Sequence, residues 1–270
     1  MKKQRPDTIR AMKEPVICFG QQPCGFLPKR FLVAKIESAK KLQKEIGGKI
    51  VFFYHDSDAD YKETITLFRD PINGEDVRLN FTQENKIQKK YSPLYAKMIP
   101  NDWKEETERK LPRLVSKQIV QLFHDAEGKN ASDFCLNLYE KLGLFEGIEV
   151  VRSGSKEFRE QALDLEQFYA DIPYEGELVR AELHNGEFRL HEGGGKYLTI
   201  PSPKIIEKWQ KNPGRDERFK WMQSVIHCTH YIAGKGENAY LKKENFPDVT
   251  FVERDDIEDS NYAFIPDFQN

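Results

Sequence analysis

The sequence predicts an α/β fold with an open parallel sheet and inserted antiparallel hairpin and meander elements. Two short apolar runs, residues 15–19 and 49–54, flank a segment at 28–46 whose apolar residues recur at helical spacing. Further strand–loop–helix steps follow near residues 147–168 and 229–238. A strand–helix–strand unit has a right-handed crossover and parallel strands, so we expect all these strands to run in the same direction.

The first unit places two polar loops at one edge of the sheet. GQQPCGF at residues 20–26 follows the first strand, the helix at 28–46 ends at Gly47-Gly48, and HDSDAD at residues 55–60 directly follows the second strand. Loops that follow parallel strands leave the same carboxyl edge. Open α/β sheets bind their ligands at that edge.

The next stretch interrupts the parallel pattern. Residues 64–82 contain two extended runs around Asn73-Gly74, which predict a hairpin. Residues 86–110 are polar and contain two prolines, so we expect a surface connection with little regular structure. Helices are then predicted over 114–126 and 131–142, with Ser132 or Asp133 as the N-cap of the second.

The remaining elements complete the pattern. A strand over 147–151 leads through SGS into a helix that reaches about residue 168, and a meander of strands and turns occupies residues 177–200. The last predicted elements are helices over 204–211 and 218–226, a strand over 229–233, a helix from Asn238 and a strand over 249–253. We expect a single domain over residues 1–270, with insertions at about 64–110 and 171–203.

Composition excludes several classes of function. With 42 Lys and Arg against 44 Asp and Glu, a net charge of −2 gives no general attraction to nucleic acid or an anionic membrane, although a local basic groove stays open. The apolar runs are strand-sized, and the N-terminus lacks the apolar stretch of a signal peptide. Four cysteines without CxxC spacing predict reduced thiols. We therefore expect a cytoplasmic protein.

Four strand-to-helix loops carry the candidate chemistry: residues 20–26, 55–60, 153–155 and 234–237. Backbone N–H groups at a helix N-terminus bind anions, and glycine lets a phosphate approach them closely. The spacing fits neither a dinucleotide-binding GxGxxG fingerprint nor a P-loop.

These loops resemble the motifs of the bacillithiol-synthesis cysteine-adding enzyme family. That family typically shows a GQQ-x-G loop, a helix with a lysine, an EDHDF-x-E segment and a GGPGE-x-AY segment. The matching residues here are Gly20, Gln21, Gln22 and Gly25 in the first motif, Lys35 in the helix, Asp58, Asp60 and Glu63 in the next segment, and Gly234, Gly236, Glu237, Ala239 and Tyr240 in the last.

The resemblance implies a Rossmann-like core related to class I aminoacyl-tRNA synthetases and nucleotidylyltransferases. It implies a ligase-like enzyme that binds ATP or ADP, with or without Mg²⁺, and joins an amino acid, cysteine in the family, to an amine of a small sugar-derived acceptor. Asp58 and Asp60 would hold the amino group or a metal ion, and Glu237 the ribose or the acceptor. Nucleotide contacts would come from Gly20, Gln21, Gln22, Gly25, Lys35, Gly234 and Gly236.

The departures from the family pattern leave alternatives open. Ser57 and Ala59 stand where the family has Glu and His, and the family's long coiled coil does not follow Pro266. Two competing interpretations follow: a non-catalytic relative that binds a nucleotide or metabolite, and a nucleotidylyltransferase that acts on another small molecule.

Several candidate residues also have plainer interpretations. The carboxylates at 55–60 are equally typical of a solvated loop, and Lys35 of a solvated helix face. Cys24 is either a nucleophile or a small residue that fills the loop. His227, Cys228 and His230 form an incomplete zinc pattern, so no metal site is predicted there.

Overall fold

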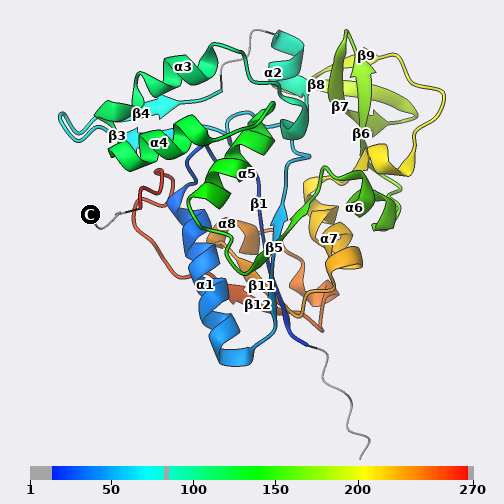
Figure 1. The fold of residues 1–270 in the computed structure, drawn as a ribbon. Coiled ribbons are helices and arrows are strands. Elements are labelled where there is room, and N and C mark those ends of the chain that lie inside the picture. The colour runs from blue at the N-terminus through cyan, green and yellow to red at the C-terminus, as the bar shows by residue number, and fades with distance from the viewer. Residues whose placement is uncertain (1–13, 82–84, 267–270) are drawn as a thin grey trace, which may run out of the picture.

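A five-stranded parallel sheet forms the centre of the molecule (Figure 1). The structure is a computed structural model that describes residues 14–81 and 85–266. The strand order is β12-β11-β1-β2-β5, and each neighbouring pair is parallel. The strands are β1 (Val16–Gln21), β2 (Lys49–Tyr54), β5 (Ile148–Arg152), β11 (His230–Ala233) and β12 (Thr250–Glu253). The predicted α/β class with an open parallel sheet is confirmed.

Helices cover both faces of this sheet. Alternate residues of a strand point to opposite faces, and the sheet accordingly separates two apolar clusters. On one face Phe19 and Phe52 pack with α1 (Arg30–Ile46) and α5 (Ala131–Lys141). On the other face Phe53 packs with residues of α6 (Lys156–Gln161) and α7 (Arg218–Ile226). Residues 51 to 54 are all buried because the strand is covered on both sides.

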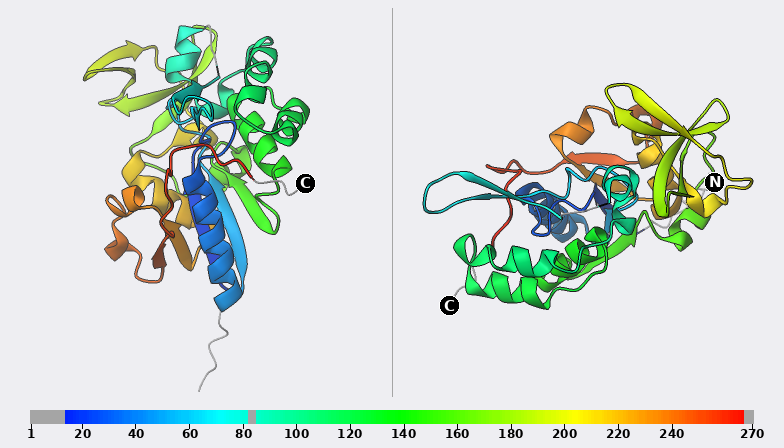
Figure 2. Two further views of the ribbon diagram at one scale, coloured as in Figure 1. Left: turned by 90° about the vertical axis from the view of Figure 1, so that its left-hand side faces the viewer. Right: turned by 90° about the horizontal axis from the view of Figure 1, so that it is seen from above.

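The remaining elements gather beyond the carboxyl edge of the parallel sheet, in the upper part of Figure 1. One group is the hairpin β3–β4 with three helices, and Figure 2 shows the hairpin and the second sheet projecting on opposite sides. The bounds of this group are β3 (Thr66–Arg69), β4 (Asp76–Leu79), α2 (Lys86–Tyr91), α3 (Trp103–Glu108) and α4 (Lys117–Asp125).

A second, antiparallel sheet completes the fold in the order β10-β6-β7-β8-β9. Its strands are β6 (Tyr169–Tyr174), β7 (Glu177–His184), β8 (Glu187–Gly193), β9 (Lys196–Ile200) and β10 (Lys211–Asn212). It has a small core of its own, to which α2 contributes Tyr91. The hairpin around Asn73-Gly74 and the meander over 177–200 are confirmed as antiparallel elements.

Short helices complete the described chain. They are η1 (Leu94–Ala96), η2 (Leu111–Arg113), η3 (Lys208–Gln210), η4 (Arg215–Glu217), α8 (Lys235–Asn238) and η5 (Lys243–Asn245). Within residues 14–81 and 85–266, no helix combines the length and the apolar character needed to cross a membrane.

The expectation of an irregular connection over 86–110 is wrong. The segment contains α2, η1 and α3, and it buries Tyr91, Leu94 and Trp103. Its two prolines precede η1 and α3 instead of interrupting them. Pro at or just before the first turn is compatible with a helix. Short helices with few apolar positions leave too weak a periodicity to be seen in the sequence.

Other boundaries also differ from prediction. Helix α6 ends at Gln161 instead of reaching residue 168, and Ala162 and Leu165 beyond it pack in the apolar cluster on the α6 and α7 face of the sheet. The strand β6 follows, and it was not predicted from the sequence. The predicted helix over 204–211 is reduced to the three-residue η3, since residues 211 and 212 pair with β6. α5 is capped by the side chain of Asn130, and α8 begins before Asn238.

Candidate functional site

The strand order places a topological switch point between β1 and β11. The chain runs outward from β1 through β2 to β5 and then returns to the other side of β1 with β11 and β12. Ligands of open α/β folds bind outside the carboxyl ends of the strands at such a point. A pocket of about 60 Å³ lies there, and it brings together residues from the first and third motifs. Its lining includes Gly20, Gln21, Gln22, His55, Arg215, Arg218, Tyr231, Glu237 and Tyr240. We call it the switch-point pocket.

Lys35 connects the two motifs beneath this pocket. Its ammonium donates to the carbonyl oxygen of Gly20 at 2.7 Å and to the carboxylate of Glu237 at 2.5 Å. The other carboxylate oxygen of Glu237 accepts from the hydroxyl of Tyr231 at 3.1 Å. Lys35 is only 2% exposed. It is therefore not a solvated lysine, and its ammonium is already engaged within the protein instead of being open to a phosphate.

Asp58 is held between two arginines. Arg218 of α7 donates to one carboxylate oxygen at 2.8 Å and Arg180 of β7 to the other at 3.2 Å. Gln22 also donates to Asp58, at 3.3 Å. Burial favours the neutral acid, but the charges of Arg218 and Arg180 outweigh burial and keep the pKa of Asp58 well below its usual range. Asp58 therefore connects three parts of the chain instead of presenting a free carboxylate.

His55 is the exception among the polar groups of the pocket. Among the described residues its ring nitrogens have no hydrogen-bond partner, although the ring is 8% exposed and packs edge-on against Phe53. Burial and the nearby charge of Arg218 lower the pKa of His55 well below its usual value. A neutral imidazole that lines a pocket with both nitrogens unengaged is available to a ligand.

Gly20 is required by this arrangement. A Cβ atom at this position would lie 2.7 Å from Nε2 of His55 and 2.9 Å from the hydroxyl oxygen of Tyr231. The glycine thus lets the imidazole and the phenol approach the end of β1.

The N-terminus of α1 is closed, which corrects the expectation that its N–H groups are free. At the start of α1, the amides of Arg30 and Phe31 donate to carbonyl oxygens of Tyr262 and Ser260, because the C-terminal segment crosses there. At α8 the amide of Gly234 donates to the carboxylate of Glu237 at 2.9 Å. Anion binding at the start of α1 would therefore depend on side chains.

The other predicted site residues lie apart from the pocket. Gly25 is buried with a φ of +101°, and a Cβ atom there would lie 2.7 Å from the carbonyl oxygen of Leu27, so it serves the turn. Gly236 lies on the exposed side of α8, with open space around it. Asp60 is exposed and lines a different cleft. Cys24 is fully buried, and burial raises its pKa, which favours its plainer interpretation as a loop residue.

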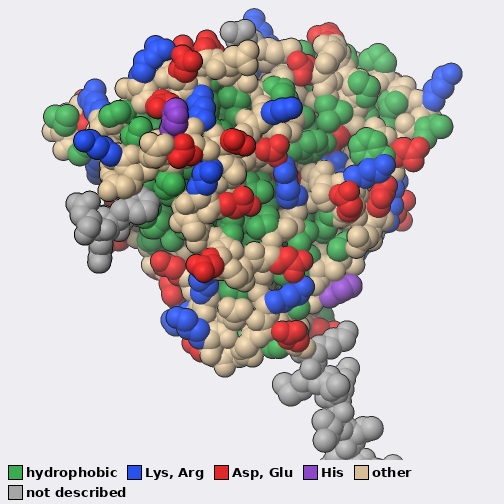
Figure 3. Space-filling model, viewed as in Figure 1, with side chains coloured by type: hydrophobic (Ala, Val, Ile, Leu, Met, Phe, Trp, Pro, Cys, Tyr) green, Lys and Arg blue, Asp and Glu red, His purple; other side chains and the backbone are tan. Residues whose placement is uncertain are grey.

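A basic cleft adjoins the switch-point pocket. It has a volume of about 840 Å³, and Arg215 and Arg218 line both spaces. Three carboxylates line the cleft, Asp60, Glu182 and Glu192, against eight cationic side chains. The cations are Lys62, Lys86, Lys89, Lys90, Arg180, Arg189, Arg215 and Arg218. By contrast, positive and negative side chains are mixed on the face seen in Figure 3.

Sequence reasoning missed both the arginines and His55. The three arginines lie 120 residues or more beyond the first motifs, and long-range packing of the second sheet and of α7 brings them together: Arg180 is on β7, Arg215 on η4 and Arg218 on α7. His55 did carry a signal, because it directly follows a buried strand.

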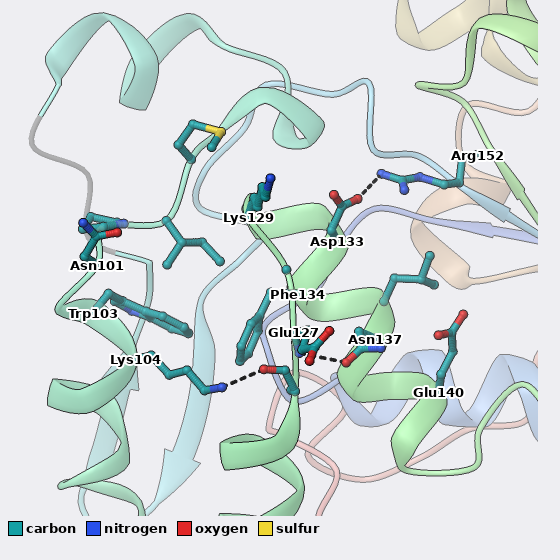
Figure 4. A pocket seen from close by; sticks show the side chains of 16 residues that line it. Asn101, Trp103, Lys104, Glu127, Lys129, Asp133, Phe134, Asn137, Glu140 and Arg152 are labelled. Atoms are coloured by element: carbon teal, nitrogen blue, oxygen red, sulfur yellow. Dashed lines mark hydrogen bonds and ion pairs between the residues drawn. The ribbon is translucent and has the colours of Figure 1, made fainter.

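A cavity of about 1020 Å³ lies between α3 and α5 (Figure 4). Several of its polar groups are engaged within the protein: Lys104 donates to the carbonyl oxygens of His124 and Ala126, and Asp133 pairs with Arg152 at 2.7 Å. It contacts the parallel sheet through Arg152, away from the switch point.

No cluster of three or more metal-ligating side chains occurs in the part of the chain that the structure describes. His227 and His230 lie near the start of β11, at the opposite edge from the switch-point pocket, and His230 bonds Thr229 at 2.9 Å. Asp58 is engaged with Arg180 and Arg218, and Asp60 is exposed.

Comparison with models of known protein families gave no match, and comparison with curated proteins gave no similar sequence. The resemblance to cysteine-adding enzymes therefore depends on the motif residues. Seven of these motif residues lie together around the switch point: Gly20, Gln21, Gln22, Lys35, Asp58, Gly234 and Glu237.

Proposed function

We propose that this protein is a nucleotide-binding, ligase-like enzyme that joins an amino acid, cysteine if the family role holds, to an amine of a small sugar-derived acceptor. The observation that carries the proposal is the meeting of the first and third motifs at the switch point, beside a cleft lined by an excess of cations. Amide formation from a carboxylate requires a leaving group on its oxygen, which ATP supplies by adenylation or phosphorylation.

Size and charge favour a nucleotide that extends from the switch-point pocket into the basic cleft. The pocket of about 60 Å³ accepts only a small group, whereas small-molecule sites usually measure roughly 300–1,000 Å³. Arg215 and Arg218, which line both spaces, are suited to bind phosphate oxygens and to offset the negative charge that develops on them. If Mg²⁺ takes part, the phosphates themselves would provide most of its ligands.

His55 is suited to act as the general base. The attacking amine loses a proton as the amide forms, and a neutral imidazole can accept it. The ring lines the switch-point pocket with its nitrogens unengaged. It would supply the basic group that Ala59 cannot. The four buried cysteines fit a reducing compartment, and we propose that the reaction takes place in the cytoplasm.

One observation favours a second candidate, a nucleotide- or metabolite-binding protein without catalysis. Two of the motif carboxylates, Asp58 and Glu237, are engaged in ion pairs within the protein. Without one of these two carboxylates to bind the amino group, the switch-point pocket could bind ligand and perform no condensation. A nucleotidylyltransferase would use the same pocket and release pyrophosphate.

Nucleotide binding and product analysis separate these candidates. ATP or ADP at millimolar concentration should raise the melting temperature, because a ligand that binds only the folded state stabilises it. Incubation of ATP with amino acids and amino sugars should release pyrophosphate, or phosphate with ADP, together with an amide product detectable by mass spectrometry. Nucleotide binding without turnover would favour the non-catalytic protein. Absence of any nucleotide-induced shift would contradict both enzyme candidates and would leave only a protein that binds another metabolite.

A further inference from the structure

The outer part of the basic cleft carries lysines that the fold leaves without an acidic partner. Among the described residues, Lys62, Lys86 and Lys89 line the cleft, and none of them lies within 4.0 Å of a carboxylate. By contrast, Lys90 pairs with Glu192 at 3.9 Å and Arg189 with Glu182 at 2.9 Å. The lysines of the outer cleft therefore carry positive charge that no described carboxylate neutralises. In the inner cleft, by contrast, Arg180 and Arg218 are paired with Asp58.

Two of these lysines are brought together by one short helix. Lys86 and Lys89 are three residues apart on α2, and Lys90 follows four residues after Lys86. Residues at these spacings share a helix face, where like charges repel. A bound anion would remove that repulsion.

The helix that carries them is fixed at both ends. The side chains of Asn85 and Gln88 both donate to the carboxylate of Glu177 on β7, at 2.7 and 2.9 Å. The ammonium of Lys97 donates to the carbonyl oxygens of Gln88 and Lys89, at 3.0 and 2.7 Å, from a position that is 1% exposed. α2 therefore holds its lysines in place before any ligand binds, which lowers the entropy cost of binding.

The aromatic rings of the cleft are already covered by cations. Lys89 lies 5.3 Å from the ring centre of Tyr61, Lys90 5.1 Å from that of Tyr91, and Arg180 4.4 Å from that of Tyr169. A site for single-stranded nucleic acid uses open aromatic faces on which bases stack. These covered rings instead favour a ligand that is recognised through its charge.

We propose that the outer cleft, formed by Lys62, Lys86 and Lys89, binds a small molecule that carries two or more phosphate groups. Such a ligand provides several negative charges within a few ångströms, which matches the closely spaced lysines of α2. In the proposed reaction this ligand would be a substrate other than the nucleotide. That role rests on the proposed function, whereas the existence of the binding site does not.

Titration calorimetry with tripolyphosphate tests the site, with AMP as a separate probe of the switch-point pocket. The parent protein should bind tripolyphosphate, and the double variant Lys86→Gln/Lys89→Gln should bind it at least tenfold more weakly. The variant's affinity should also depend less steeply on salt concentration. The matched control is Lys40→Gln/Lys44→Gln on the exposed side of α1, which should bind as the parent does.

The outcomes are distinguishable. No binding of tripolyphosphate to the parent, or equal binding by both double variants, would overturn the site. Equal affinity for citrate would overturn the preference for phosphate, and tighter binding of a single-stranded oligonucleotide, lost in the Lys86/Lys89 variant, would replace the small molecule with nucleic acid. Loss of AMP binding in that variant would assign these lysines to the nucleotide and overturn a separate site. Failure of AMP to bind any form would weigh against the proposed function alone.

Discussion

The ammonium of Lys35 lies 2.5 Å from the carboxylate of Glu237, a residue that is 202 positions away in the sequence. The pair connects the end of β1, through the carbonyl oxygen of Gly20, to the turn that follows β11. These two strands border the topological switch point. Motif residues that would be assigned to ligand binding from sequence alone thus also shape the walls of the pocket.

A double-mutant cycle over Lys35→Met and Glu237→Gln should give a coupling free energy of about 1–3 kcal/mol, as expected for residues in direct contact inside one network. Lys35 is nearly buried and Glu237 partly so, with side-chain exposures of 3% and 19%. The control cycle uses Lys49 and Glu149, an exposed pair at 2.9 Å, for which the coupling should stay below about 1 kcal/mol. Urea unfolding measures both. Equal coupling in the two cycles would contradict a structural role for Lys35.

Asp58→Asn should destabilise the protein by about 3 kcal/mol, the low end for breaking a buried ion pair, because Asp58 retains some contact with solvent. The change leaves Arg180 and Arg218 without their counter-charge. Asp60→Asn is the matched control, and it should change stability by less than about 0.5 kcal/mol, since Asp60 is exposed. Equal effects in urea unfolding would mean that the two arginines do not depend on Asp58.

The contrast between these two carboxylates shows what sequence could and could not predict. The βαβ pattern correctly placed Gly20, Asp58, Ser153 and Gly234 after strands that run in the same direction, because local periodicity determines strands and crossover handedness determines their orientation. The partners of Asp58 come from the second sheet and from α7. Nothing local to the motif indicates which distant arginines will pack against it.

The same reason explains the helix N-termini. The glycine-containing loop before α1 correctly predicted where that helix begins, within two residues, whereas the helix expected from Asn238 was wrong, because α8 covers Lys235–Asn238 and ends there. Whether the first amides remain free depends on the chain segment that covers them, which for α1 is residues 258–263. Long-range contacts of this kind leave no periodic signal in the sequence.

The Lys97→Met variant should remove a pH-dependent part of the stability. Burial lowers the pKa of Lys97 to about 7, although Asp60 and Asp58 oppose this shift. Between pH 7 and the unfolded value near 10.4, the unfolded chain binds a proton that the folded protein does not, so this group makes stability rise with pH. From pH 7 to 8.5 the parent should gain on the variant by up to about 1.4 kcal/mol per pH unit. Parallel stability curves for the two proteins would show that Lys97 remains protonated when folded.

His55→Gln should alter the acid limb of the stability curve. Because burial and then the charge of Arg218 lower the pKa of His55, the folded protein holds a neutral ring while the unfolded chain takes up a proton near pH 6.5. Stability of the parent is therefore lost as the pH falls below about 6.5, with a slope of at most about 1.4 kcal/mol per pH unit for this one group. Urea unfolding at several pH values between 5 and 7.5 measures the difference between the two proteins, in which the contributions of the other histidines cancel. Glutamine keeps a polar side chain at the switch-point pocket but does not titrate, so the variant should lose less stability on acidification than the parent.

The same His55→Gln variant tests the proposed general base. Amide formation should fall by about 10²–10⁴-fold, while nucleotide binding at pH 7 should stay close to that of the parent. A variant that keeps its activity, or whose stability falls with acidification as steeply as that of the parent, would contradict the assignment of a neutral, ligand-facing imidazole.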